Sequence, residues 1–216
     1  MTIAVLRLKK LTKKKLKFLS ICLSIILYLN PSFVNGKPLV EGQVIIEGDS
    51  LENILDRKLR ATGNASLERD SKSIKANLIE YDQISDELTA IGNVQFDTDQ
   101  SSIKGTELEL SLDSNTGSIV NATFNSILDD KNPKFNNTLR GSATLLFLEG
   151  ESKKRLQNAS LTTCEANQDD WFINASELEI NERSQRVDAK NAKLEFKGFP
   201  ILFSPCLLYT SPSPRD

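Results

Sequence analysis

The same pattern of residues occurs twice at a spacing of 29 residues, measured from Gly63 to Gly92, and this repeat limits what the chain can fold into. The stretch Ala-Thr-Gly-Asn at 61–64 returns as Ala-Ile-Gly-Asn at 90–93. A fixed period of this size indicates one supersecondary unit that is used repeatedly. Each copy is therefore expected to fold in the same way and to stack on the next.

Apolar and polar residues alternate within each copy of the repeat. In the second copy the apolar positions include Leu88, Ala90 and, after the Gly-Asn pair, Val94 and Phe96. A period of two residues is typical of β-strands with one dry face. Short clusters of Asp, Ser, Asn and Gly separate these runs and favour turns. The repeat unit is therefore predicted to be an antiparallel β-hairpin.

Strand character continues beyond the two strong copies. We expect further strands near 143–148, 155–163, 170–180 and 187–196, after a polar loop at 125–137. One face of each strand is apolar, so successive hairpins would bury these faces against each other in a two-sided β structure, a jellyroll or sandwich-like solenoid. Its inner residues could be an ordinary core or the lining of an apolar trough. Periodicity alone does not separate these two readings.

The phrase Asn-Ala-Ser or Asn-Ala-Thr occurs at Asn64, Asn121, Asn158 and Asn174. As a sequon it would be an acceptor for N-glycosylation. Because the phrase recurs at equivalent points of the strand units, we interpret it as a feature of the repeat, with Asn near the turn and Ala small enough to pack.

The first 36 residues have the composition of a secretory signal peptide. They contain seven basic residues and no acidic one, followed by an apolar run at 18–29 and by Pro31. A run of 12 residues is short for a membrane span, which usually takes about 20. We therefore expect cleavage after Gly36, with a retained N-terminal anchor as the alternative. Residues 37–60 are expected to form an irregular lead-in.

Charge and composition argue against several classes of function. Removal of the seven basic residues leaves 20 basic against 29 acidic ones, a net charge of −9, which disfavours nucleic acid as a partner. The chain contains no His, the commonest general base and metal ligand. Glu165, Asp169 and Asp170 are interpreted as a solvated turn rather than as a metal or acid–base site. We expect no enzymatic activity, no metal and no cofactor.

The repeat at 61–124, with its Ala-x-Gly-Asn-Val element and the Ile-Lys-Ala…Glu-Tyr-Asp run at 74–82, resembles the OstA-type domain that periplasmic proteins of lipopolysaccharide (LPS) transport share. The motifs Thr-Thr-Cys and Asp-Trp within 162–171, the strand at 175–180 and the run Phe-Lys-Gly-Phe-Pro-Ile-Leu-Phe-Ser-Pro at 196–205 resemble the domain–barrel junction of outer-membrane LPS-assembly proteins. The resemblance covers about Leu59 to Pro205.

This resemblance implies an all-β, OstA-type jellyroll in the periplasm of a Gram-negative bacterium, at the cell outer membrane. Such a domain receives LPS from a periplasmic bridge of similar jellyrolls, which it meets by edge-strand pairing, and passes it to a C-terminal β-barrel plugged by an outer-membrane lipoprotein. No bond in the lipid is made or broken. The groove for the acyl chains is expected to be lined by Ile74, Ala76, Leu78, Leu88, Val94, Phe96, Ile103, Leu108, Leu110, Ile119, Phe124, Leu145, Phe147, Ile173, Leu178, Ile180, Val187, Leu194 and Phe196.

Cys164 is a candidate for a disulfide. Cys22 would leave with the signal peptide, and Cys206 lies in the segment 206–216 that is excluded from the predicted fold, so Cys164 stands alone. An odd Cys in an oxidising compartment suggests a distant partner. In the family that the chain resembles, the matching Cys is linked to Cys residues near the end of the barrel. A catalytic thiol is disfavoured, because there is no His to activate it.

The end of the chain departs from the family pattern. Residues 197–205 are expected to begin a linker to a missing β-barrel, after a jellyroll at 61–196, whereas 206–216 resemble a translated sequencing adapter and are excluded from the predicted fold. Two alternatives remain open. One is a soluble bridge or chaperone of the same transport pathway, and the other is a β-solenoid that binds or cleaves polysaccharide.

Overall fold

The computed structural model describes residues 42–54, 56–127, 138–166, 168–181, 183–184 and 186–210. The described residues form only strands and turns, so they contain no helix that could cross a membrane. The expected signal peptide, most of the loop at 125–137 and residues 211–216 lie outside the described residues. The strands are β1 (Val44–Glu47), β2 (Ser50–Ile54), β3 (Lys58–Arg69), β4 (Lys72–Asp82), β5 (Glu87–Asp97), β6 (Ser101–Ser111), β7 (Thr116–Ile127), β8 (Thr138–Glu149), β9 (Lys153–Thr162), β10 (Trp171–Asn181), β11 (Arg186–Phe196) and β12 (Phe199–Thr210).

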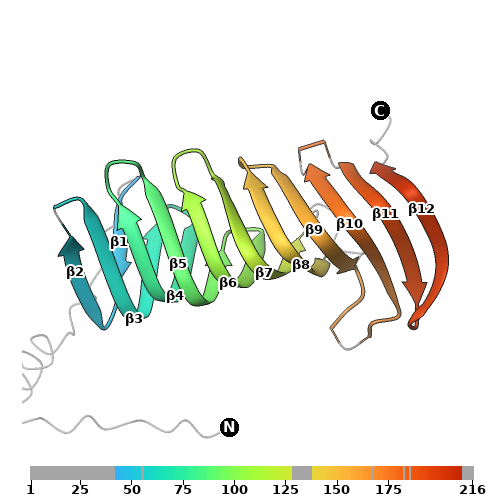
Figure 1. The fold of residues 1–216 in the computed structure, drawn as a ribbon, viewed down its shortest axis with the longest axis horizontal. Helices are drawn as coiled ribbons and strands as arrows, with labels where there is room; N and C mark the ends of the chain where they lie inside the picture. The colour runs from blue at the N-terminus through green and yellow to red at the C-terminus, as the bar shows by residue number, and fades with distance from the viewer. Residues whose placement is uncertain are drawn as a thin grey trace, which may run out of the picture. The chain divides into compact units, whose positions relative to one another are not determined.

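All twelve strands belong to one antiparallel sheet in which each strand from β3 to β11 pairs with the next in the chain. Figure 1 shows them side by side in sequence order, from blue to red. The exception is at the N-terminal edge, where β1 and β2 both pair with β3. The expected all-β fold built from repeated antiparallel hairpins is therefore confirmed.

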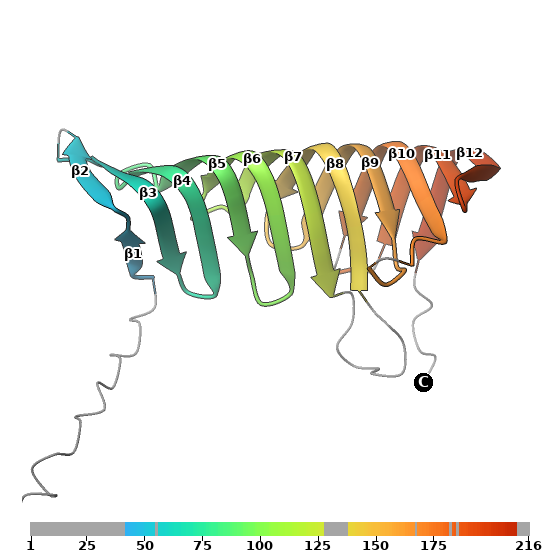
Figure 2. The same ribbon diagram turned by 90° about the horizontal axis from the view of Figure 1, so that it is seen from below.

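Each long strand bends near its middle, so the single sheet folds over into two facing layers (Figure 2). We call the bend the corner, and the two apolar faces that look at each other the inner face. In β6, Ile103 and Gly105 point inward before the corner, whereas Leu108 and Leu110 point inward after it. Strict alternation is therefore interrupted at the corner, where the two residues between Gly105 and Leu108 both point outward.

A column of Asn residues follows the corner along alternate strands. Each has a positive φ between 45° and 52°, a left-handed conformation that Asn tolerates better than most residues. Each Nδ2 donates a hydrogen bond to a side chain on the preceding strand or turn. The pairs and their distances are Asn64–Asp49 (3.1 Å), Asn93–Asn77 (3.3 Å), Asn121–Thr106 (3.4 Å), Asn158–Thr144 (3.2 Å) and Asn191–Ser176 (3.0 Å).

Three of the four Asn residues in the Asn-Ala phrase, Asn64, Asn121 and Asn158, lie at the corner, in agreement with a structural role in the repeat. They lie in mid-strand, however, and not near a turn as expected. Asn174 also precedes a buried Ala, but it is not among the residues of positive φ. Asn93 and Asn191 belong to the column without matching the phrase, because Val and Ala-Lys follow them. The backbone bend, rather than the three-residue phrase, is what the repeat preserves.

The Gly-Asn pair adds one residue at the corner of β3 and β5, where the register shifts against the neighbouring strands. Gly63 and Gly92 have φ of 72° and 79°, and an added Cβ at Gly63 would lie 2.4 Å from the Asp49 side chain. Both positions therefore require Gly. In β7 the Gly is missing, so Asn121 follows Asn93 by 28 residues rather than 29.

The two rows of inner-face residues on either side of the corner differ in the size of their side chains. In one row most side chains are large and at most 2% exposed, as for Ile79, Leu108 and Leu156. The row on the other side of the corner is small, and includes Ala122 and Ala159. Because the layers converge at the corner, large side chains from one layer fill the space that small ones leave in the other.

The sheet has an open edge at each end. β1 and β2 form one edge, and β12 forms the other and exposes large apolar side chains, including Phe199, Ile201 and Phe203. The sheet thus extends beyond the expected boundaries at residues 61 and 196. Residues 197–205, expected to begin a linker, form the β11–β12 turn and the first part of β12, which continues through residue 210.

Candidate functional site

Most of the expected groove residues lie on the inner face between the two layers. The buried ones are Ile74, Ala76, Leu88, Val94, Phe96, Ile103, Leu108, Leu110, Ile119, Phe124, Leu178 and Ile180. Ile173, Val187 and Leu194 are half-buried on the same face. Phe196, at the end of β11, is 46% exposed. The inner face is therefore a continuous apolar surface across the strands of both layers.

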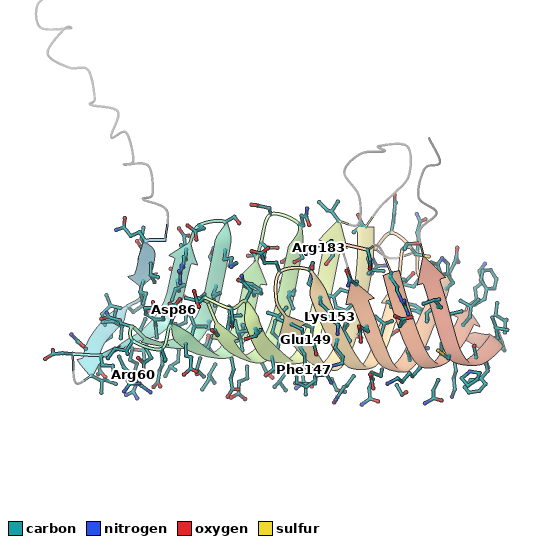
Figure 3. The ribbon with its side chains drawn as sticks, turned by 90° about the horizontal axis from the view of Figure 1, so that it is seen from above. Arg60, Asp86, Phe147, Glu149, Lys153 and Arg183 are labelled. Atoms are coloured by element: carbon teal, nitrogen blue, oxygen red, sulfur yellow. The ribbon has the colours of Figure 1, made fainter. Side chains whose placement is uncertain are left out.

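Leu78, Leu145 and Phe147 lie on the opposite, convex face, which corrects their assignment to the groove. Leu78 is directly opposite Ile91, which is 47% exposed. Phe147 is directly opposite Arg155, whose guanidinium lies 4.3 Å from the centre of the ring. Figure 3 shows Phe147 on this convex side of the ribbon.

These three residues were misplaced because, in a run of adjacent apolar residues, the sequence does not show which side chains point inward. Residues 145–148 are all apolar, and so are Leu78 and Ile79. The change of phase at the corner decides that Ile79, Leu146 and Leu148 point inward, with exposures of 0%, 1% and 7%. These residues, and the small Ala residues beside the corner other than Ala76, were not among the expected groove residues.

The space between the layers is largely filled by their own side chains. An internal cavity of about 10 Å³, lined by residues such as Phe124, Leu146 and Ile180, has room for no more than one water molecule. A larger pocket of about 280 Å³ opens at the mouth, where the layers end. Phe96, Ile103, Leu110 and Leu148 form its apolar part, and its polar part comes from turn residues and two Lys side chains.

Polar contacts close the mouth near the N-terminal end of the sheet. Arg69 Nη1 donates to Asp86 Oδ2 at 2.5 Å, Tyr81 Oη donates to Asp86 Oδ1 at 2.6 Å, and Lys72 Nζ donates to Asn115 Oδ1. Arg69 is paired with the first residue of β4, whereas Asp86 follows the end of the same strand. The contact between them therefore joins the two layers.

Burial and ionic contacts shift the pKa values of this group. Burial, together with the hydrogen bond to Asp86, raises the pKa of Tyr81 to about 12. Burial opposes ionisation of Asp86, but hydrogen bonds from Tyr81 and Arg69 outweigh it and lower the pKa of Asp86. At neutral pH the contact therefore consists of a carboxylate, a guanidinium and a neutral phenol.

Cys164 lies half-buried in the loop between β9 and β10 and is a free thiol. Arg140 holds this loop, because its Nε donates to the Cys164 carbonyl at 2.9 Å and its Nη2 donates to Asp169 at 2.6 Å. A hydrogen bond with Thr162 is the main cause that lowers the pKa of the thiol. Glu165, Asp169 and Asp170 are exposed, and the described residues contain no cluster of three potential metal ligands.

Comparison with known proteins identifies the family. Residues 73–186, more than half of the chain, match the family described as LptA/(LptD N-terminal domain) LPS transport protein. The LPS-assembly protein LptD of Nitrosomonas eutropha is 30% identical over 199 residues, which cover 89% of this chain and 26% of that protein. LptD of Chromobacterium violaceum is 24% identical over 186 residues, which cover 82% of this chain and 24% of the relative.

One solved structure is that of LptH, the LptA-homologous periplasmic component of the lipopolysaccharide transport device of Pseudomonas aeruginosa. The two chains are 10% identical, and the match covers 79% of this chain and 96% of LptH. The TM-score is 0.31, so this likeness adds nothing to the fold described above. The chain spans about a quarter of the length of the LptD relatives. On the family match, the chain belongs to the LptA/LptD N-terminal domain family of LPS transport proteins, a family of carriers rather than enzymes.

Proposed function

We propose that this chain is the LPS-binding and transfer domain of an LptD-type outer-membrane assembly protein. The observation that carries the proposal is the continuous inner face, which is apolar in both layers and reaches an open pocket at the mouth. Acyl chains gain about 0.8 kcal/mol for each CH₂ group removed from water. A dry inner face can therefore carry a lipid through an aqueous compartment without any chemical step.

The filled interior sets a condition on this function. The cavity of about 10 Å³ next to the mouth pocket has no room for an acyl chain, so we infer that the two layers move apart where a chain passes it. Separation exposes inner-face side chains, and that cost reduces the net affinity. A weak and reversible site of this kind suits handover between successive carriers.

The two open edges of the sheet support a proposal about the partners. We propose that one edge pairs with a periplasmic jellyroll bridge by strand addition, a use of exposed strand edges known in protein recognition. The domain would then lie in the periplasm against the outer membrane, exported by the predicted signal peptide. The proposed barrel, with its lipoprotein plug, would follow residue 205, and Cys164 would form its disulfide with that barrel.

Site-specific photo-crosslinking tests the groove. A benzoylphenylalanine at Phe96 or Leu110, both inner-face residues at the mouth pocket, should crosslink to LPS. The matched control is Phe147, an aromatic residue on the convex face, where no crosslink is expected. Equal crosslinking from Phe96 and Phe147 would refute the inner-face site.

A second candidate is a soluble bridge protein, because the matching family includes LptA as well as the N-terminal domain of LptD. Reading the genomic DNA downstream of the Pro205 codon separates the two. Several hundred residues of amphipathic strands of about ten residues, with late Cys codons, would support the LptD-type protein. A stop codon within a few residues would favour the soluble carrier.

A further inference from the structure

Two polar contacts cross the mouth and join the rims of the two layers. Arg69 and Lys72 flank the β3–β4 turn, which lies at the free rim of one layer (Figure 2). Asp86 and Asn115 lie in the β4–β5 and β6–β7 turns, at the rim of the other layer. Arg69 Nη1 donates to Asp86 Oδ2 at 2.5 Å. Lys72 Nζ donates to Asn115 Oδ1. We call these four residues the clasp.

Two other ion pairs, by contrast, each lie within one layer. Arg57 Nη2 is 2.7 Å from Asp82 Oδ2, and the ladder partner of Asp82 is Lys58, the residue after Arg57. Lys153 contacts Glu179 on the neighbouring strand of the same layer. Movement of the layers away from each other would leave such pairs intact but would break the clasp. A contact that is made only in the closed state shifts the equilibrium toward that state.

The charged half of the clasp is partly shielded from water. The side chains of Arg69 and Asp86 are 22% and 21% exposed, so solvent screens their attraction less than that of a fully exposed pair. Tyr81, which is buried, donates to Asp86 Oδ1 at 2.6 Å and leaves the other oxygen to Arg69. Charge-assisted hydrogen bonds are stronger than those between neutral groups. The clasp therefore resists opening of the mouth.

The clasp also borders the way to the inner face. Lys72 and Asn115 both line the mouth pocket, whose apolar part includes Phe96 and Ile103. An apolar molecule that passes from this pocket to the space between β4, β5 and β6 must therefore pass the clasp.

We propose that the clasp is a conformational gate, which sets how often the two layers separate over β4 to β6. This inference rests on the proposed function, in which the layers move apart, and adds the contact that opposes the movement. A ligand that binds only the open state has an apparent affinity reduced by the fraction of molecules that are open. Loss of the clasp should therefore strengthen binding of an apolar ligand, although no clasp residue needs to touch that ligand.

Binding of the uncharged dye N-phenyl-1-naphthylamine, whose fluorescence rises in apolar surroundings, tests the gate. Asp86→Asn removes the charge and keeps a residue type that tolerates the φ of 57° at this position. It should tighten dye binding about tenfold, the factor for loss of one charge-assisted hydrogen bond from the closed state. Asp82→Asn is the matched control, because it removes an ion pair within one layer. Its dye affinity should stay within about twofold of the unaltered chain.

A second variant approaches the same contact from the other layer. Arg69→Gln should tighten dye binding as much as Asp86→Asn does. The double variant should add nothing to either single change, because both remove one shared interaction. Additive effects, or an unchanged affinity in both single variants, would overturn the gate while the proposed function stands.

Hydrogen exchange separates opening of the gate from local unfolding, which would also admit the dye. The ladder hydrogen bonds of a sheet run between neighbouring strands, so movement of the layers away from each other leaves them intact. Deuterium uptake by peptides of β4 to β6 in Asp86→Asn should therefore equal that of the unaltered chain. Faster uptake together with tighter dye binding would identify local unfolding and overturn the gate. If neither the unaltered chain nor Asp86→Asn binds the dye, the inner face takes no apolar ligand and the proposed function fails, and the gate with it.

Discussion

Replacement of Asn121 tests whether the corner depends on backbone conformation. Asn121 has a φ of 52° in β7, and its Nδ2 donates to Thr106 Oγ1 at 3.4 Å on the exposed surface. A left-handed conformation costs an ordinary L-residue about 1–2 kcal/mol, and Asn is among the few that adopt it readily. The exposed hydrogen bond adds about 0.5 kcal/mol at most. Asn121→Ala should therefore destabilise the domain by about 1–2.5 kcal/mol.

The Gly variant separates the two contributions. Asn121→Gly also loses the hydrogen bond, but Gly adopts positive φ without a steric penalty, so its cost should stay below about 1 kcal/mol. Asn174→Ala is the matched control, because this Asn also precedes a buried Ala but is not among the residues of positive φ. Its effect should be within about 0.5 kcal/mol.

The free energy of unfolding is measured by urea titration at 25 °C, with far-UV circular dichroism and the fluorescence of the single Trp171 as two probes. Coincident transitions would justify a two-state fit. If Asn121→Gly were as destabilising as Asn121→Ala, the left-handed backbone would not be the cause. If Asn174→Ala matched Asn121→Ala, the Asn-Ala phrase rather than the corner would matter.

Three further predictions concern the core, the turns and the thiol. Leu108→Ala removes a fully buried side chain and should cost about 2–5 kcal/mol, measured by the same urea titration. A hydrogen bond from Arg57 is the main cause that lowers the pKa of Asp82 from 3.8 to about 2, so its stabilisation is present above pH 3.8 and is lost as the pH falls toward 2. Asp82→Asn should therefore flatten the loss of stability over that range; an unchanged slope would exclude the ion pair as its source. Cys164 should react with a disulfide reagent more slowly in the Thr162→Val variant, because the lowered pKa of the thiol depends chiefly on Thr162. Peptide mass spectrometry after timed quenching measures the rate. An equal rate in both proteins would contradict this cause.

The strands and much of the inner face could be predicted from the sequence because they are local. Alternation at Leu88, Ala90, Val94 and Phe96 identifies both the strand and its buried side, since the side-chain period of a strand is two. The repeat of the Gly-Asn pair identified the hairpin unit, whereas its place at the corner of β3 and β5 is seen only in the structure. In these stretches, each residue's environment depends on its immediate neighbours.

The tertiary structure decided the features that depend on the bend. In the apolar run at 145–148 every residue could face inward by composition, and only the change of phase at the corner places Leu146 inside and Phe147 outside. The contact between Arg69 and Asp86 joins the two layers of a folded strand, and Lys154 reaches the mouth pocket only because the layers face each other there. Alternation describes a strand along its length, but it contains no information on where the sheet folds over, and that fold determines which side chains meet.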